Sequence, residues 1–388
     1  MTTQTVEPTL PRYSESSLDA LATSVLASLA VPGEPNPLQL PPADRVCVLL
    51  IDGLGWELLS AHPAAAPFLS ELAMTSSPLT AGFPATTATS LGTIGTGRPP
   101  GQHGLLGYQV AVPGSGKLLN ALRWDASIDP VSWQPGSTIF ERAAGAGVKA
   151  FRVAPRAFRT SGLSVAAMRG AEFLAADTLG ALVSRAVSAL ADASPALALV
   201  YYGDLDSTGH ALGCGSDAWQ YQLAHVDKLA EQLAAALPRG TVLHVTGDHG
   251  MTDVPPDNRI DVDALPELRE GISLLGGEPR ARHLYCKPGA ADDVHRRWAG
   301  VLGDRAWVVS REQAVADGWF GPVDSRFAAR IGDVIVAPCG PCAVVATKTE
   351  PRESALSGMH GSLTQADQLV PLLTISTSRP AAPEPDTG

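Results

Sequence analysis

Acidic residues and histidines follow apolar runs at three places in this sequence. Asp52 follows VCVLLI, Asp206 and His210 lie in DLDSTGH after ALALVYYG, and Asp248 and His249 follow TVLHVTG. Each residue alone is more often a helix cap or a loop residue than a ligand. Together, carboxylate oxygens and imidazole nitrogens suit zinc first and manganese second. The set therefore indicates a site for divalent metal ions.

A further histidine, His360, lies in the flexible sequence GMHG. Asp206 and His210 are four residues apart, so a helical turn would place both side chains on one face. A lone histidine is more often a structural residue than a ligand, so the interpretation depends on the whole set.

Two adjacent threonines are candidate nucleophiles. In GFPATTATS, Pro84, Thr86 and Thr87 precede a helical run over residues 88–94, which is typical of a helix start. Free N–H groups and the helix dipole favour an anion at that end. A plain threonine cap would explain one threonine, but not the small residues around it, which let a ligand come close.

The elements that must position these residues are the three apolar runs, residues 46–52, 196–203 and 241–247. Unbroken aliphatic runs of this kind predict strands that are buried on both faces of a parallel sheet. Ligands of open α/β sheets bind outside the carboxyl ends of the strands. We therefore expect an α/β fold in which three strands deliver aspartates to one edge.

Helical periodicity predicts an amphipathic first helix with Leu18, Leu21, Val25, Leu26 and Leu29, followed by a proline-rich connector. The glycine-rich residues 107–135 predict a long loop over the site, with a hairpin as one form. Further helices are expected over residues 56–60, 64–75, 138–146, 173–193 and 219–237, and further strands over residues 148–153 and 371–375.

Composition shifts after residue 251, where arginines and short elements predict a small α+β insert. Its expected elements are residues 283–286, 292–302, 307–309, 311–317 and 331–336, with residues 344–349 returning to the core. We expect an N-terminal helix and linker (1–42), a catalytic domain (43–254 and 343–378), an inserted lid or cap (255–342) and a disordered tail (379–388).

Bulk composition excludes some partners. A formal charge of −11 over 388 residues disfavours a nucleic acid polymer or an anionic membrane as a partner. The chain shows no basic segment before the apolar residues 21–31 and no run that could span a bilayer. The five cysteines do not resemble a disulfide framework, and Cys339 and Cys342 form a lone CxxC, interpreted as an inert turn rather than a redox site. We expect a cytoplasmic protein; its oligomeric state is left open.

The set IDGLG, FPATTATS with GTGRPPGQHG, DSTGH, GDHGM and GMHG resembles the alkaline phosphatase superfamily, most closely its type I phosphodiesterase/nucleotide pyrophosphatase branch. The resemblance covers about residues 44–255 and 343–375. It implies a doubly wound, mostly parallel central sheet and two zinc ions. One ion would be bound by Asp52, Thr87, Asp248 and His249, and the other by Asp206, His210 and His360.

The resemblance also implies that Thr87 is the nucleophile, with Thr86 as the fallback. A free threonine hydroxyl is a weak nucleophile, but metal coordination lowers its pKa. Thr87 would attack phosphorus in a small phosphorylated substrate and form a phosphothreonine, which water would then hydrolyse.

The sequence departs from the branch at two positions. Tyr108 stands where an asparagine usually donates to a phosphate oxygen; its hydroxyl would either donate instead or pack on the lid. Asp204 forms a DxD with Asp206 and is either a support for a histidine or, as we favour, a solvated carboxylate.

Two other functions remain open. A phosphomonoesterase or phosphonate hydrolase would use the same metals and would need extra cations, for which Arg280, Arg282 or Lys287 are candidates. A member without turnover would bind a nucleotide or a protein. The second is disfavoured because all seven expected ligands are present.

Overall fold

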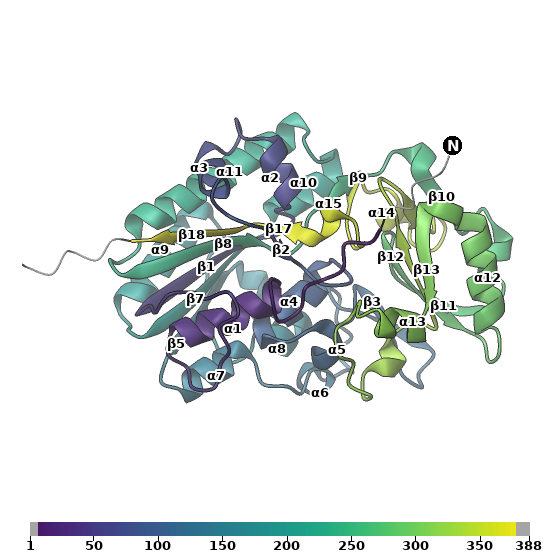
Figure 1. The fold of residues 1–388 in the computed structure, drawn as a ribbon, viewed down its shortest axis with the longest axis horizontal. Coiled ribbons are helices and arrows are strands. Elements are labelled where there is room, and N and C mark those ends of the chain that lie inside the picture. Colours follow the sequence, from purple (N-terminus) through teal and green to yellow (C-terminus); the bar gives the residue numbers. More distant parts are fainter. Residues whose placement is uncertain (1–6, 378–388) are drawn as a thin grey trace, which may run out of the picture.

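The computed structural model describes residues 7–377, and its centre is a six-stranded sheet in the order β18–β8–β1–β7–β5–β6 (Figure 1). All neighbours are parallel except β18, which runs antiparallel to β8 at one edge. The predicted mostly parallel sheet is confirmed. Its strands are β1 (Arg45–Ile51), β5 (Lys149–Ala154), β6 (Glu172–Ala175), β7 (Ala196–Tyr202), β8 (Thr241–Gly247) and β18 (Leu372–Ser376).

Both faces of this sheet are covered. In β1, Val46, Val48 and Leu50 join one apolar cluster, and the alternating Cys47, Leu49 and Ile51 join another. Successive side chains of a strand point to opposite faces, so an unbroken apolar run is what a doubly covered sheet needs. The first face is packed by α1 (Leu18–Ser28), α4 (Thr87–Thr96), α7 (Ile139–Gly145) and α8 (Gly162–Met168). The second is packed by α2 (Trp56–Ala61), α3 (Pro67–Ala73), α9 (Leu179–Ala191) and α11 (Asp217–Ala236).

The predicted helix over residues 173–193 is wrong at its start. Residues 172–175 form β6, which pairs in parallel with β5, and α9 begins only at Leu179. Thr178 caps α9 by accepting a hydrogen bond from the N–H of Ala181. Pairing at the sheet edge therefore overrides the helical periodicity that runs through these residues.

The segment over residues 107–135 contains the hairpin that the sequence suggested. β3 (Gln109–Val112) and β4 (Lys117–Asn120) pair antiparallel, and the short helix α6 (Pro130–Trp133) follows. A distant residue holds β3 in place, because the Tyr285 hydroxyl accepts a hydrogen bond from the Ala111 N–H.

A second, antiparallel sheet has the order β11–β12–β14–β13 and packs against α12 around Trp298 and Leu284. Every element expected in the insert is present, and β11 is an additional strand. The bounds are β11 (Ile272–Glu278), β12 (Ala281–Cys286), α12 (Ala291–Leu302), β13 (Ala306–Ser310), α13 (Arg311–Ala316) and β14 (Val334–Pro338).

Residues 344–349 do not return to the central sheet as expected. β15 (Ala343–Val345) instead pairs in parallel with β10 (Arg259–Asp261). The Val344 side chain is buried with Ile260 in the core beneath the second sheet. An apolar run shows that a strand is buried, but not which sheet buries it.

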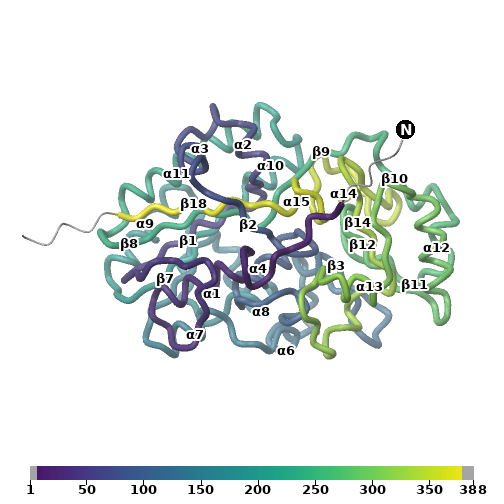
Figure 2. Tube along the Cα trace, viewed as in Figure 1, coloured from purple at the N-terminus to yellow at the C-terminus, as the bar shows by residue number. Residues whose placement is uncertain are grey.

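The second sheet lies at one end of the molecule, and short segments join it to the central sheet (Figure 2). They include β9 (Thr252–Asp253), α14 (Pro351–Ser354), β16 (Gly358–Met359) and α15 (Gln365–Gln368). Other elements are β2 (Leu79–Thr80), α5 (Pro100–His103), α10 (Asp204–Leu212) and β17 (Leu369–Val370). The predicted tail over residues 379–388 lies outside the described residues.

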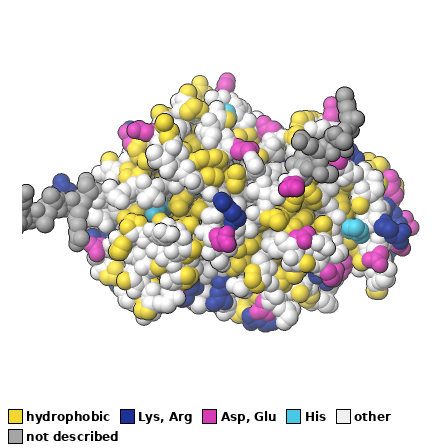
Figure 3. Space-filling view, viewed as in Figure 1, with side chains coloured by type: hydrophobic (Ala, Val, Ile, Leu, Met, Phe, Trp, Pro, Cys, Tyr) yellow, Lys and Arg dark blue, Asp and Glu magenta, His cyan; other side chains and the backbone are white. Residues whose placement is uncertain are grey.

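Across residues 7–377, no helix has both the length and the apolar character needed to cross a bilayer. On the face shown in Figure 3, the side chains of Lys and Arg are scattered among acidic ones rather than gathered into a basic patch.

Candidate metal centre

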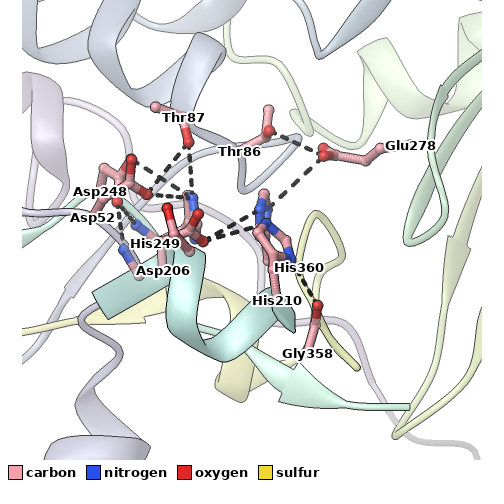
Figure 4. A network of polar contacts seen from close by, with 12 residues as sticks. Asp52, Thr86, Thr87, Asp206, His210, Asp248, His249, Glu278, Gly358 and His360 are labelled. Atoms are coloured by element: carbon pink, nitrogen blue, oxygen red, sulfur yellow. Dashed lines mark hydrogen bonds and ion pairs between the residues drawn. The ribbon is translucent and has the colours of Figure 1, made fainter. Parts of the chain in front are cut away.

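The seven residues expected to bind metal lie together at the carboxyl edge of the central sheet (Figure 4). Asp52 directly follows β1, and Asp248 and His249 directly follow β8. Asp206 and His210 lie on α10, which is helical as their spacing predicted. The remaining two are Thr87 at the start of α4 and His360 after β16.

Asp52, Asp248 and His249 form one group of ligand atoms, all within 4.8 Å of one another. His249 Nε2 lies 3.3 Å from Asp52 Oδ1 and 3.6 Å from Asp248 Oδ2. The Thr87 Oγ1 joins this group at 3.2 Å from His249 Nε2 and 3.4 Å from Asp52 Oδ1. The Tyr201 hydroxyl donates to the other carboxylate oxygen of Asp52 and so fixes its orientation.

Asp206, His210 and His360 form a second group with the same spread of ligand atoms. Asp206 Oδ1 lies 3.4 Å from His210 Nε2 and 3.8 Å from His360 Nε2. The ring of His360 stacks on that of His249 at a centroid separation of 3.7 Å, so the two groups are adjacent. Each of the two adjacent groups has the donor atoms to hold one metal ion.

Hydrogen bonds orient all three histidines alike. The Nδ1 atoms of His210, His249 and His360 lie 2.7, 3.0 and 2.9 Å from the carbonyl oxygens of Gly358, Gly250 and Ala85. A carbonyl only accepts, so each Nδ1 carries a proton, and each ring is held with its Nε2 directed at the carboxylates. This second contact is typical of histidines that bind metals.

Two carboxylate oxygens at this edge lack the hydrogen-bond partners that buried polar atoms normally have. Asp206 Oδ1 and Asp248 Oδ2 are buried and accept no hydrogen bond. Burial and the charge of Asp52 raise the pKa of Asp206 well above its usual range, and the same causes raise that of Asp248 to about 7. Burial lowers the pKa of His210 and His360, which keeps their rings neutral. Two unpartnered carboxylate oxygens, one of them beside the neutral rings of His210 and His360, fit a divalent cation, which would relieve the repulsion.

The structure also places the other predicted residues. Tyr108 lines a cavity of about 560 Å³ together with Thr87 and Asp206, and its hydroxyl donates to Glu353 Oε1 over 3.0 Å. The Tyr108 hydroxyl would have to break its hydrogen bond with Glu353 before it could donate to a phosphate oxygen. Asp204 is exposed in the first turn of α10, which agrees with a solvated carboxylate.

Two of the three cations proposed for a monoester dianion are engaged elsewhere, and the third, Lys287, is exposed and does not line the cavity. Arg280 is fully buried and forms two hydrogen bonds with Asp367, and Arg282 is buried beside Glu350 at 2.7 Å. Arg123 and Arg352 line the cavity instead.

Cys339 and Cys342 are free thiols whose pKa is raised by burial, which agrees with an inert turn.

Sequence reasoning missed Glu278, at the end of β11 in the insert. Its Oε2 accepts a hydrogen bond from Thr86 Oγ1 over 3.1 Å and lies 3.9 Å from His360 Nδ1. Burial raises the pKa of Glu278 to about 8. The only available signal was a carboxylate next to Pro279 at a glycine-rich turn, which does not show what the turn contacts.

The model of the type I phosphodiesterase/nucleotide pyrophosphatase family matches residues 46–363. No curated protein matches the chain. Among solved structures, an inactive variant of murine ectonucleotide pyrophosphatase/phosphodiesterase 5 in complex with AMP has a TM-score of 0.68 at 19% identity, over 85% of this chain and 87% of that one.

Phosphonoacetate hydrolase from Sinorhizobium meliloti, in complex with phosphonoacetate, has a TM-score of 0.65 at 18% identity. The alignment covers 88% of this chain and 92% of that one. At these identities the two likenesses show the shared fold.

Proposed function

Because the chain belongs to the type I phosphodiesterase/nucleotide pyrophosphatase family, we propose that it hydrolyses small phosphodiesters or nucleotide pyrophosphates with Thr87 as nucleophile. The observation that carries this proposal is the position of Thr87 Oγ1, 3.2 Å from His249 Nε2 and 3.4 Å from Asp52 Oδ1. A hydroxyl next to a cation-binding group is the arrangement that turns a weak nucleophile into a reactive one.

Two divalent ions, zinc first and manganese second, would lower the pKa of the Thr87 hydroxyl and offset charge on the phosphoryl group. Asp52, Thr87, Asp248 and His249 would hold one ion. Asp206, His210 and His360 would hold the other.

The protein groups supply position and proton control. Thr87 starts α4, whose free N–H groups face the end at which an anion is favoured. Asp52 Oδ1 lies within reach of the Thr87 hydroxyl proton, and its other oxygen is held by Tyr201. Attack by Oγ1 on phosphorus expels the alkoxide or phosphate leaving group and forms a phosphothreonine. Water then breaks the new P–O bond and restores the threonine.

A second candidate is hydrolysis of a phosphomonoester or a phosphonate. It is favoured by Arg123 and Arg352, which line the cavity and whose guanidinium groups form no hydrogen bond or ion pair with other described residues. Two free guanidinium groups suit a substrate with a further negative charge.

The test is a substrate panel on protein reconstituted with zinc or manganese. It contains bis-p-nitrophenyl phosphate, p-nitrophenyl phosphate, a dinucleotide pyrophosphate and phosphonoacetate. We expect the highest kcat/KM with a diester or a pyrophosphate. A highest value with the monoester or the phosphonate would select the second candidate, and no turnover of any of them would refute both.

The location that we propose is the cytoplasm. All five cysteines are free thiols, which suits a reducing compartment. Fractionation of expressing cells and probing of the thiols in intact cells would check it; export with oxidised cysteines would contradict it.

A further inference from the structure

Thr86 occupies the N-cap position of α4 without capping it. Its backbone is extended, with φ −144° and ψ 148°, as an N-cap residue requires. Its hydroxyl nevertheless makes no hydrogen bond to the first turn and donates to Glu278 Oε2 over 3.1 Å.

Other threonines in this chain behave differently. Thr138, Thr178 and Thr364 cap α7, α9 and α15 by accepting from the N–H three residues further on. Thr178 has nearly the same backbone as Thr86, with φ −136° and ψ 156°. The backbone at Thr86 therefore permits a cap, and the direction of the side chain prevents it.

The carboxylate that holds this side chain comes from the other sheet. Glu278 is 8% exposed and lines the same cavity as Thr86 and Thr87, and its Oε1 has no hydrogen-bond partner (Figure 4). A buried carboxylate with one unpartnered oxygen is costly, as is an uncapped helix. Both costs arise at one contact beside the proposed nucleophile.

We propose that Glu278 is a positioning residue, which holds the Thr86 hydroxyl away from α4 and so keeps the N–H groups of its first turn free for the phosphoryl oxygens of the substrate. Released from Glu278, the Thr86 hydroxyl takes the cap position that Thr178 takes in α9, and it competes with the substrate for the Thr89 N–H. This inference rests on the proposed function for the identity of the anion, but not for the movement of Thr86.

The kinetic test uses three variants. Glu278→Ala is expected to lower kcat/KM for the best substrate of the panel about 10- to 100-fold, since it blocks a donor to the transition state. Glu278→Gln, whose amide oxygen still accepts from Thr86, stays within about threefold of wild type. Glu278→Ala combined with Thr86→Val recovers most of the loss, because valine cannot cap.

Recovery in the double variant is the decisive result, because a merely structural role for Glu278 predicts that the two losses add. A double variant no better than Glu278→Ala would overturn the proposal, as would a Glu278→Gln variant as impaired as Glu278→Ala. Metal content is measured throughout, because Glu278 lies 3.9 Å from His360. A matched control is Asp227→Ala, also 8% exposed, whose carboxylate accepts from the Leu69 N–H away from the site; it should keep its kcat/KM.

Crystal structures of wild type and Glu278→Ala separate this inference from the function. We expect Thr86 Oγ1 on Glu278 in the first and within hydrogen-bond distance of the Thr89 nitrogen in the second. If Thr86 moves but no substrate is turned over, only the proposed function fails. If Thr86 does not move, the positioning role fails whatever the activity.

Discussion

Thr87 Oγ1 lies 3.2 Å from His249 Nε2, although 162 residues separate the two in the chain. Thr87 belongs to the first turn of α4 on one face of the sheet, and His249 follows β8, the strand next to the edge strand β18. The contact places a hydroxyl inside a group of buried candidate metal ligands.

Thr87→Ala should lower kcat at least about 1,000-fold, because it removes the attacking oxygen. Metal content should remain largely intact, since three protein ligands of that group stay in place. Steady-state kinetics and elemental analysis of the same preparation check both statements. Wild-type-like activity would refute the assignment. The same measurement on Thr86→Val would then test Thr86, the fallback nucleophile.

Asp206→Asn should reduce the retained metal by about one ion per chain, since it removes the charged ligand of the second group. Asp204→Asn is the matched control two residues away, because Asp204 is exposed and its loss leaves the group complete. Elemental analysis after gel filtration distinguishes the variants. Equal metal content in both would contradict the role given to Asp206.

Chelation should lower the unfolding temperature. Without cations, Asp206 Oδ1 and Asp248 Oδ2 are buried without hydrogen-bond partners, which destabilises the folded state. Titration of zinc or manganese into the metal-free protein should restore the unfolding temperature, measured by scanning calorimetry. Activity should return over the same range of metal concentration. A melting curve that is indifferent to these ions would count against a metal centre.

Arg280→Met should destabilise the fold by about 3–5 kcal/mol, because it leaves Asp367 buried and unpaired. Arg326→Met, which removes an exposed partner of Asp324, is the control and should have little effect on chemical denaturation. A loss for Arg280→Met no larger than that of the control would show that the buried pair is dispensable.

Stability should fall as the pH drops below about 6.5, and His244 is one cause. Burial lowers its pKa to about 4, so the unfolded chain binds a proton more readily than the folded one between these values. The stabilisation present at neutral pH is lost as the pH falls through this window, by roughly 2 kcal/mol at pH 5. His244→Gln should flatten the dependence measured by urea unfolding.

The exposed His225→Gln serves as the control and should leave the pH dependence unchanged. Parallel curves for wild type and His244→Gln between pH 5 and pH 8 would show that another group is responsible.

The sequence could predict the central sheet and its acidic edge because both depend on local patterns. The run ending at Asp52 is apolar at every position, and the structure divides it between two clusters on opposite faces of the sheet. Parallel strands end at one edge, so Asp52 and Asp248 were expected at the same edge, and the pairing of β1 with β8 brings them together. The i, i+4 spacing of Asp206 and His210 was equally local.

Only the tertiary structure decided which parts of the second sheet reach the site. Glu278 and Arg280 lie on one hairpin, yet one contacts Thr86 and the other Asp367, 192 and 87 residues away. Likewise, β15 pairs with β10 rather than with the core. Periodicity records whether a residue is buried, but the partner of a buried carboxylate is set by how two sheets pack, and no local pattern contains that information.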